Sequence, residues 1–282
     1  MTLAKPHSKT RWGTHIALWI VCFIMLIPAL YALQNATLTV EEAAFPPPRL
    51  FPPGADLIPN MRVLFEELGF GQLIVNTMVV SLVVVIGKTI LALLAGLAFV
   101  YFRFPGRTFL FFFILLTLLM PTEIILLPLF RMMGGNELGW GEAFPRLALT
   151  VPFLATATGA FLFRQHFNNI PRELAEAAQI DGATPIRFLF AVLVPMSWNV
   201  IVAHSLIQFI ASWNSYLWPV LIVQNVEDQI IQVGVRNALS YNFIADFGVL
   251  MSAGLIASLP PLLLFIVMQR QFMSGFAITR DK

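Results

Sequence analysis

The chain has 282 residues, of which 58% are hydrophobic and 11% are charged, and its formal net charge is +2. Soluble domains carry roughly 25% charged residues to cover their surface, so this composition excludes water as the main solvent of the fold. The small, dispersed net charge does not favour nucleic acid as a partner. Cys22 is the only cysteine, which excludes an intramolecular disulfide and a metal site built from several cysteines.

The N-terminal segment, 1–15, carries three basic residues and precedes the first apolar run, 16–33. This arrangement resembles a signal peptide, but no small-residue cleavage site of the Ala-x-Ala kind follows it. An apolar run of about 18 residues can cross a membrane as a helix. We therefore expect a short cytoplasmic segment followed by a retained first transmembrane helix.

A long segment, 34–72, separates the first apolar run from the second and contains the proline clusters 46–48 and 52–53. Prolines fix the backbone angle φ and oppose regular structure, so we expect an external loop with a short amphipathic piece near 61–68. Two interpretations stay open: a surface that contacts an external partner, or a simple connector.

Five more apolar runs follow, each with about 20 residues or more, which is enough to cross a hydrocarbon layer of about 30 Å. They occupy residues 73–102, 109–130, 147–167, 197–223 and 247–268. A backbone in lipid must satisfy its own hydrogen bonds, which favours helices. The sequence thus predicts an all-α integral membrane fold with six transmembrane helices, a five-helix core over 73–268 and a cytoplasmic tail, 269–282.

Basic residues are distributed unevenly between the two sets of loops. The side of the N-terminus would hold eleven of them: Lys5, Lys9, Arg11, Arg103, Arg107, Arg164, Arg172, Arg187, Arg270, Arg280 and Lys282. The other side would hold five: Arg49, Arg62, Arg131, Arg146 and Arg236. Cytoplasmic loops are enriched in Lys and Arg, so we expect both termini on the cytoplasmic side of a prokaryotic plasma (inner) membrane.

The loop 168–195, between the fourth and fifth runs, has the pattern of two short helices joined by a sharp turn. Pro171 suits the start of a helix, and residues 172–180 are good helix formers. Gly182 can adopt the left-handed conformation that ends such a helix, and Pro185 can begin the next one. A compact helical knob of this kind either binds another protein or lies against lipid headgroups.

The same loop resembles the EAA loop of ABC importer permeases. Glu176-Ala177-Ala178 is followed by three residues, Gly182, nine residues and then Val192-Leu193-Val194-Pro195. The family pattern ends in Ile-x-Leu-Pro, so Val192 and Val194 are conservative departures. This spacing is long and specific, and it implies a type I ABC importer permease fold. The residues that couple transport to ATP hydrolysis would then be Glu176, Ala177, Ala178, Asp181 and Gly182.

Two other stretches are similar to permeases of the carbohydrate-uptake, maltose-system type: 96–107, with the sequence Arg-Phe-Pro-Gly-Arg at its end, and 213–219. In that family the subunit assembles with a homologous second permease subunit, two ATPase subunits and an extracytoplasmic solute-binding protein. The chain lacks the Gly-x-x-x-x-Gly-Lys-Ser/Thr sequence that cradles ATP phosphates. The resemblance therefore implies a subunit that is not an enzyme, with ATP and Mg bound by the partner ATPases and no cofactor of its own.

Two charged residues, Lys88 and Glu123, fall inside apolar runs. Charges in lipid are costly and are usually paired or functional. Counting about 1.5 Å per residue from the inner end of each run places both about 20 Å from the cytoplasmic boundary. They could form an ion pair that fixes packing, line the substrate path, or relay protons.

The fifth run carries a polar stripe, since His204, Gln208, Ser212 and Ser215 recur at helical spacing. With Asn214 beside them, these residues are expected to face the translocation path; the alternative is polar contact between helices. A metal site at His204 is not expected, because no cluster of partner ligands accompanies it. We expect the tryptophans at 213 and 218, with Tyr216, to form an interfacial aromatic belt; the alternative is a platform on which a sugar stacks.

Within the carbohydrate-uptake group, the chain most resembles the glycerol-3-phosphate branch in residues 120–123 and 162–165 and in Lys88. This resemblance implies sn-glycerol-3-phosphate as the solute. A neutral sugar, an oligosaccharide or a polyol is the alternative. A secondary transporter would account for Lys88 and Glu123 but not for the loop 168–195. An intramembrane enzyme would need a convergent catalytic group, and the sequence shows neither a Ser/Lys nor a paired-Asp arrangement.

Overall fold

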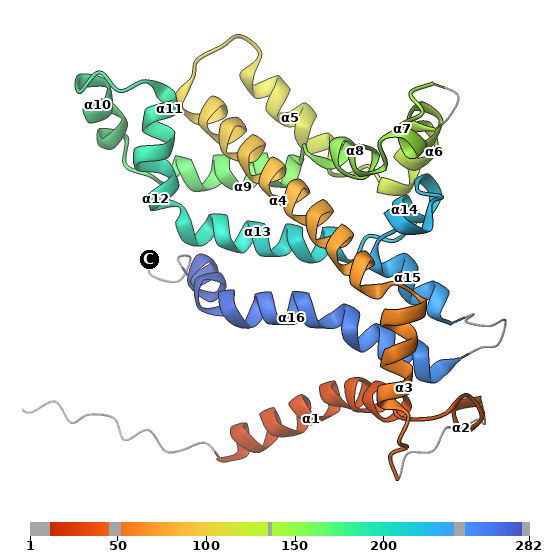
Figure 1. Ribbon diagram of the computed structural model, residues 1–282. Coiled ribbons are helices and arrows are strands. Elements are labelled where there is room, and N and C mark those ends of the chain that lie inside the picture. Colours follow the sequence, from red (N-terminus) through yellow and green to blue (C-terminus); the bar gives the residue numbers. More distant parts are fainter. Residues whose placement is uncertain (1–11, 45–51, 135–136, 240–245, 278–282) are drawn as a thin grey trace, which may run out of the picture. The chain divides into compact units, whose positions relative to one another are not determined.

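The computed structural model describes residues 12–44, 52–134, 137–239 and 246–277 (Figure 1). The described parts contain helices and turns and no strand, which confirms the all-α prediction. The basic residues at 5, 9 and 11, the prolines at 46–48 and the end of the tail from 278 lie outside the described residues.

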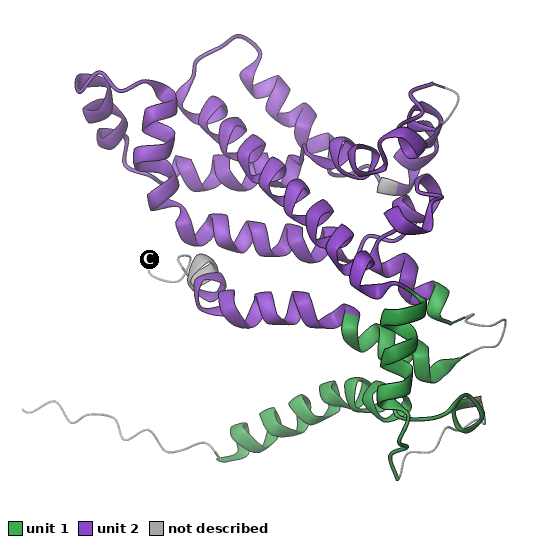
Figure 2. Cartoon of the chain, viewed as in Figure 1, with its two compact units in different colours: residues 1–68, 237–256 green, residues 69–236, 257–282 purple. Residues whose placement is uncertain are grey.

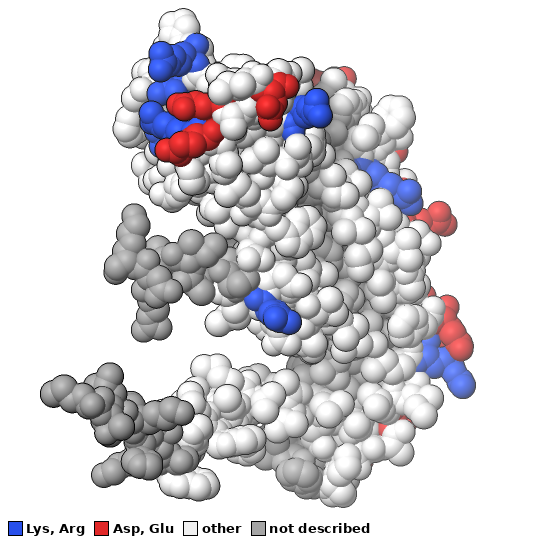
Figure 3. Space-filling model, turned by 90° about the vertical axis from the view of Figure 1, so that its left-hand side faces the viewer, with Lys and Arg blue, Asp and Glu red and all other residues white. Residues whose placement is uncertain are grey.

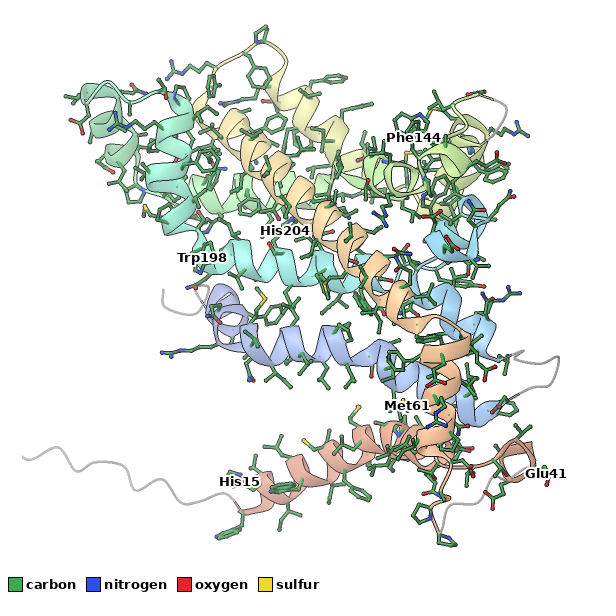
Figure 4. All side chains as sticks on the ribbon, in the orientation of Figure 1. His15, Glu41, Met61, Phe144, Trp198 and His204 are labelled. Atoms are coloured by element: carbon green, nitrogen blue, oxygen red, sulfur yellow. The ribbon has the colours of Figure 1, made fainter. Side chains whose placement is uncertain are left out.

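Two compact units divide the chain, residues 1–68 with 237–256 and residues 69–236 with 257–282 (Figure 2). The first unit contains α1 (Trp12–Asn35), α2 (Val40–Ala44), α3 (Leu57–Arg62), the π-helical turn η1 (Val63–Glu67) and the beginning of α16 (Phe247–Ala277). Helices α3 and η1 cover most of the segment near 61–68 that the sequence predicts to be amphipathic, and Met61 is labelled in Figure 4.

The larger unit holds the remaining helices. They are α4 (Phe70–Tyr101), α5 (Arg107–Thr117), α6 (Thr122–Met133), α7 (Trp140–Ala143), α8 (Pro145–Thr150), η2 (Val151–Phe153), α9 (Ala157–Asn168), α10 (Arg172–Ile180), α11 (Pro185–Phe188), η3 (Leu189–Leu193), α12 (Val194–Met196), α13 (Trp198–Trp213), α14 (Leu217–Ile222), η4 (Val226–Asp228), most of α15 (Ile231–Ala238) and the rest of α16.

In the first unit, a buried amide joins the end of α1 to α3. The Asn60 side chain donates to the backbone oxygens of Ala36 (3.0 Å) and Leu38 (3.1 Å). Gly248, at the start of α16, packs closely against the same backbone segment: a Cβ at this position would lie 2.6 Å from the Leu38 oxygen. A polar side chain therefore satisfies backbone groups where the chain leaves a long apolar helix.

The core of the larger unit is built around α4, which packs against α9 and α13 (Figure 1). Glycines let α4 and α9 cross closely: a Cβ on Gly96 would lie 2.8 Å from the Phe163 Cβ, and one on Gly159 would lie 2.6 Å from the Ala92 Cβ. Small residues at helix crossings are the usual way in which helices in lipid gain packing contacts. Larger side chains at either position would force the two helices apart.

Three described helices are long and apolar enough to cross a membrane: Trp12–Asn35, Phe70–Tyr101 and Phe247–Met273. Two bent pairs, Pro145–Phe153 with Ala157–Asn168 (43°) and Pro185–Met196 with Trp198–Trp213 (84°), raise the total to five if each is one span. The run 109–130 is not one continuous helix, because it divides into α5 and α6 just before Pro121. Proline lacks the N–H that a continuous helix needs, which explains the break.

The tryptophans at 213 and 218 are buried in the larger unit, so the prediction that they lie in an interfacial belt is wrong for both. Their side chains are 0% and 3% exposed, and each indole N–H donates to a backbone oxygen, that of Ala257 at 2.9 Å and that of Ala148 at 3.0 Å. In an α-helix these two oxygens would accept from residues 261 and 152, which are prolines. Each indole therefore satisfies a carbonyl that a proline four residues later leaves without its helical donor.

Candidate coupling loop and polar path

Helix α10 begins and ends where the sequence predicts. Pro171 precedes its first turn, and Gly182 lies just beyond its end with φ of 69°. The Gly182 N–H donates to the Gln179 oxygen (3.0 Å) and the Ala183 N–H to the Ala178 oxygen (2.9 Å). This pair of bonds defines a Schellman motif, which requires a left-handed residue at the position of Gly182.

The next helix, α11, also starts as predicted, with Pro185 at its first position. The Thr184 hydroxyl caps it by accepting from the Arg187 N–H at 3.3 Å. Helix α11 continues through η3 into α12, and the chain then turns by 84° at Ser197 into α13. The loop 168–195 is therefore a rigidly capped pair of short helices.

The expected coupling residues divide between two faces of this loop. Glu176, Ala177, Asp181 and Gly182 are exposed, whereas Ala178 is half-buried and packs against the core of the larger unit. Figure 3 shows acidic and basic side chains gathered at the end of the larger unit that carries α10. Ile180 is 86% exposed, and Leu174 and Ile186 are also exposed, so the surface of this loop combines charged with large apolar side chains.

A cavity of about 200 Å³ lies under α10 and α11, between them and the end of α4. Ala175, Ala178, Ala183 and Phe188 line it from the loop, and Tyr101 lines it from the end of α4. The two aromatic rings meet edge to face at 5.1 Å, and the Tyr101 hydroxyl is buried without a hydrogen-bond partner among the described residues. Sequence reasoning missed Tyr101, because it ends an apolar run as an ordinary interfacial aromatic would.

The structure gives Lys88 a partner other than Glu123. The Lys88 ammonium donates to the Gln208 side-chain oxygen at 2.8 Å, which joins α4 to α13. Glu123 is exposed in the first turn of α6, and the described residues contain no ion pair between it and Lys88. The equal depth of Lys88 and Glu123 in the membrane holds only if 109–130 is one straight helix, and the break before Pro121 shows that it is not.

Polar side chains continue along the contact between α4 and α13. The hydroxyls of Thr89 and Ser205 are hydrogen-bonded at 3.3 Å. Thr89 directly follows Lys88, and Ser205 lies three residues before Gln208. His204, labelled in Figure 4, is 2% exposed and meets the Phe163 ring edge to face at 5.5 Å; its Nε2 has no partner among the described residues. Thr89 and Ser205 were missed, although one lies beside Lys88 in sequence.

The C-terminal part of the expected polar stripe does not lie on the same helix as the rest, because α13 ends at Trp213. Ser212 is half-buried in the last turn, and Ser215 lies beyond the helix in the break before α14. Asn214 accepts a hydrogen bond from the Gln232 side chain at 3.2 Å. His204, Gln208 and Ser212 therefore share a helix, and Ser215 does not extend their spacing.

A second polar network, which sequence reasoning missed, holds the segment around η4 against α4. The Asn76 side chain, 2% exposed, donates to the backbone oxygens of Glu227 (2.6 Å) and Gln229 (3.1 Å), and its own oxygen accepts from Arg146 at 3.5 Å. The Ile231 N–H donates to the Thr77 hydroxyl at 2.8 Å. The signal available was an Asn-Thr pair near the beginning of the apolar run 73–102.

Comparisons with known proteins agree along most of the chain. Residues 88–276 match the family described as "Binding-protein-dependent transport system inner membrane component". The sn-glycerol-3-phosphate transport system permease protein UgpE of Pectobacterium atrosepticum is 36% identical over 269 residues, covering 93% of this chain and 94% of that protein. The protein of the same name from Brucella melitensis biotype 1 is 34% identical over 277 residues, covering 94% and 95%.

The fold is similar to that of a bacterial ABC transporter involved in the import of the acidic polysaccharide alginate. The TM-score to one of its chains is 0.75 at 20% sequence identity, and the match covers 96% of this chain and 99% of the other.

Proposed function

This chain belongs to the family of binding-protein-dependent transport system inner membrane components, and we propose that it forms half of the translocation pathway of an importer for sn-glycerol-3-phosphate. It is a multi-pass inner membrane protein and a permease subunit of an ABC importer. The observation that supports this solute is the 36% identity over 269 residues to a permease named for sn-glycerol-3-phosphate. A neutral sugar, oligosaccharide or polyol is the competing solute.

The polar contact between α4 and α13 supports an anionic solute. Lys88 carries a positive charge inside a helix of membrane-spanning length, and Gln208 holds its ammonium through one hydrogen bond at 2.8 Å. An ammonium has three donors, so this bond leaves two for a phosphate. A cation in a region of low dielectric offsets the cost of bringing a phosphate monoester there. We propose Lys88 and Gln208 as path residues, with His204, Ser212, Asn214 and Ser215 along the same segment and Glu123 at the start of α6.

The partner that the family description implies is a solute-binding protein. We propose the rest of the assembly as a second, homologous permease subunit and two ATPase subunits, which bind ATP and Mg and carry out all of the hydrolysis. Glu176, Ala177, Asp181, Gly182 and Ile180 form an exposed face on a rigidly capped helix, which suits docking of an ATPase. We propose that α10 and both termini lie in the cytoplasm.

The test is transport by the reconstituted importer in proteoliposomes with its binding protein. We expect ATP-dependent uptake of sn-glycerol-3-phosphate that excess glycerol or maltose does not reduce. Stimulation of ATP hydrolysis by the binding protein should likewise require the phosphate ester. Saturable uptake of a neutral sugar, with none of the phosphate ester, would reject the anionic solute, whereas uptake without ATP would reject the importer.

A further inference from the structure

The turn between α4 and α5 forms a basic cavity of about 380 Å³. Arg103, Arg107 and Thr108 line it, together with Phe104, Gly106 and Phe109. Its volume falls within the range of about 300–1,000 Å³ that is typical of small-molecule sites. The cavity begins two residues after Tyr101, which ends a helix of membrane-spanning length, so it lies at the level of the lipid headgroups.

Two arginines share this cavity without an acidic counterpart. Arg107 is half-buried and donates to the Phe102 backbone oxygen at 3.1 Å, which fixes its guanidinium across the turn. Arg103 is exposed, and neither arginine has an ion pair with an acidic group in the part of the chain that the structure describes. Two cations that line one cavity favour an anion within it, and guanidinium groups match phosphate oxygens in geometry.

The turn itself is held in place by aromatic packing on α4. The Phe104 ring lies 6.1 Å from the Phe99 ring, and the Phe99 ring lies 5.5 Å from the Phe111 ring in α5. Because Phe99 is 6% exposed, the turn is anchored in the core of the larger unit. The cavity is therefore formed before any ligand binds, which lowers the entropic cost of binding.

Beside the cavity, the first turns of α5 present a row of exposed aromatic side chains. Phe109 is 76% exposed, Phe112 is 60% exposed and Phe113 is 56% exposed. In a helix next to a membrane span, such a surface faces acyl chains. The combination of two arginines with an adjoining apolar surface fits a ligand that has an anionic phosphate at one end and a hydrocarbon tail at the other.

We propose that the α4–α5 turn binds the headgroup of an anionic phospholipid, with the phosphate between Arg103 and Arg107 and an acyl chain along α5. The site is separate from Lys88 and Gln208 and needs only that the chain lies in a membrane, so it stands whatever the transported solute is. Each arginine close to an anionic lipid raises the affinity for that lipid about fivefold. Loss of both should weaken binding about 25-fold.

Native mass spectrometry of the purified importer, titrated with phosphatidylglycerol or phosphatidylcholine, measures this directly. We expect retention of phosphatidylglycerol by the wild-type complex and by an Arg131→Gln control, in which an exposed arginine elsewhere in the unit is neutralised. The Arg103→Gln/Arg107→Gln complex should lose about 25-fold in affinity. An Arg103→Lys/Arg107→Lys complex should lose less affinity than the neutral variant, since the charge is kept but the guanidinium geometry is not, and it serves as the comparison if the neutral variant assembles poorly.

Equal retention of phosphatidylcholine by the wild-type complex would overturn the proposal, as would undiminished phosphatidylglycerol binding by the neutral variant. A further titration uses inorganic phosphate as competitor. Because the acyl chain contributes to a lipid site, millimolar phosphate should leave phosphatidylglycerol bound. Complete displacement would identify a site for soluble anions and would also overturn the lipid assignment.

Discussion

The hydrogen bond from Trp213 to Ala257 makes a sharp prediction about α16. Replacing Trp213 by Phe removes the indole N–H and leaves the Ala257 oxygen without a donor, because residue 261 is proline. A buried polar group without its partner costs about 1–3 kcal/mol. The smaller ring also loses packing, since Trp213 is fully buried. The single variant therefore measures a hydrogen bond and packing together.

A second substitution separates the two contributions. Pro261→Ala restores a backbone N–H that can donate to the Ala257 oxygen within α16. In the Trp213→Phe background this change should recover about 1–2 kcal/mol of the lost free energy of unfolding. The matched control is Pro260→Ala, which restores the donor for the carbonyl at 256 instead and should give no such recovery.

The assay is equilibrium unfolding of the purified protein in mixed micelles, followed by circular dichroism for the wild type, the single variants and the double variant. If the changes in the free energy of unfolding of the two single variants add up to that of the double variant within about 0.5 kcal/mol, Trp213 and Pro261 are independent. Equal recovery with Pro260→Ala would likewise refute the reasoning, because it would show a general effect of removing proline from the helix.

The same logic predicts coupling between Trp218 and Pro152, so Trp218→Phe with Pro152→Ala should recover about 1–2 kcal/mol in the same assay; additive losses would contradict it. Gly182→Val should abolish transport with the protein still in the membrane, because a β-branched residue resists φ of 69°, whereas Gly182→Asn should keep partial activity; normal transport by the Val variant would count against coupling through α10. Lys88→Gln should lower uptake of sn-glycerol-3-phosphate tenfold or more, or about 1.4 kcal/mol, with stimulated ATP hydrolysis retained, and Lys88→Arg should lose less; unchanged uptake would make Lys88 structural.

The parts of the fold that sequence reasoning predicts well depend on local interactions. Helix α10, the left-handed Gly182 and the start of α11 at Pro185 all follow from residues within one or two turns of each other. Capping signals of this kind work because the backbone groups they satisfy belong to their neighbours in the chain.

The predictions that fail depend on tertiary structure. Hydropathy locates segments in lipid but does not show that their backbone is continuous, so it predicts one helix over 109–130 where the structure has α5 and α6. The same assumption underlies one of the three interpretations of Lys88 and Glu123, an ion pair between them, because their depths were counted along straight helices. Aromatic residues near a span end suit both an interface and a core, and only the structure shows Trp213 beside the carbonyl that Pro261 leaves free.

The close crossing of α4 and α9 limits where the protein can bend during a transport cycle. With glycines at 96 and 159 in contact distance of the opposite helix, the two helices cannot slide or rotate against each other without a steric clash, so they must move as one rigid body. Flexing is left to the interrupted positions, such as the 84° turn at Ser197 and the gap between α13 and α14. Spin labels on α4 and α9 should thus keep a constant separation through the cycle, whereas labels on α11 and α13 should report the motion.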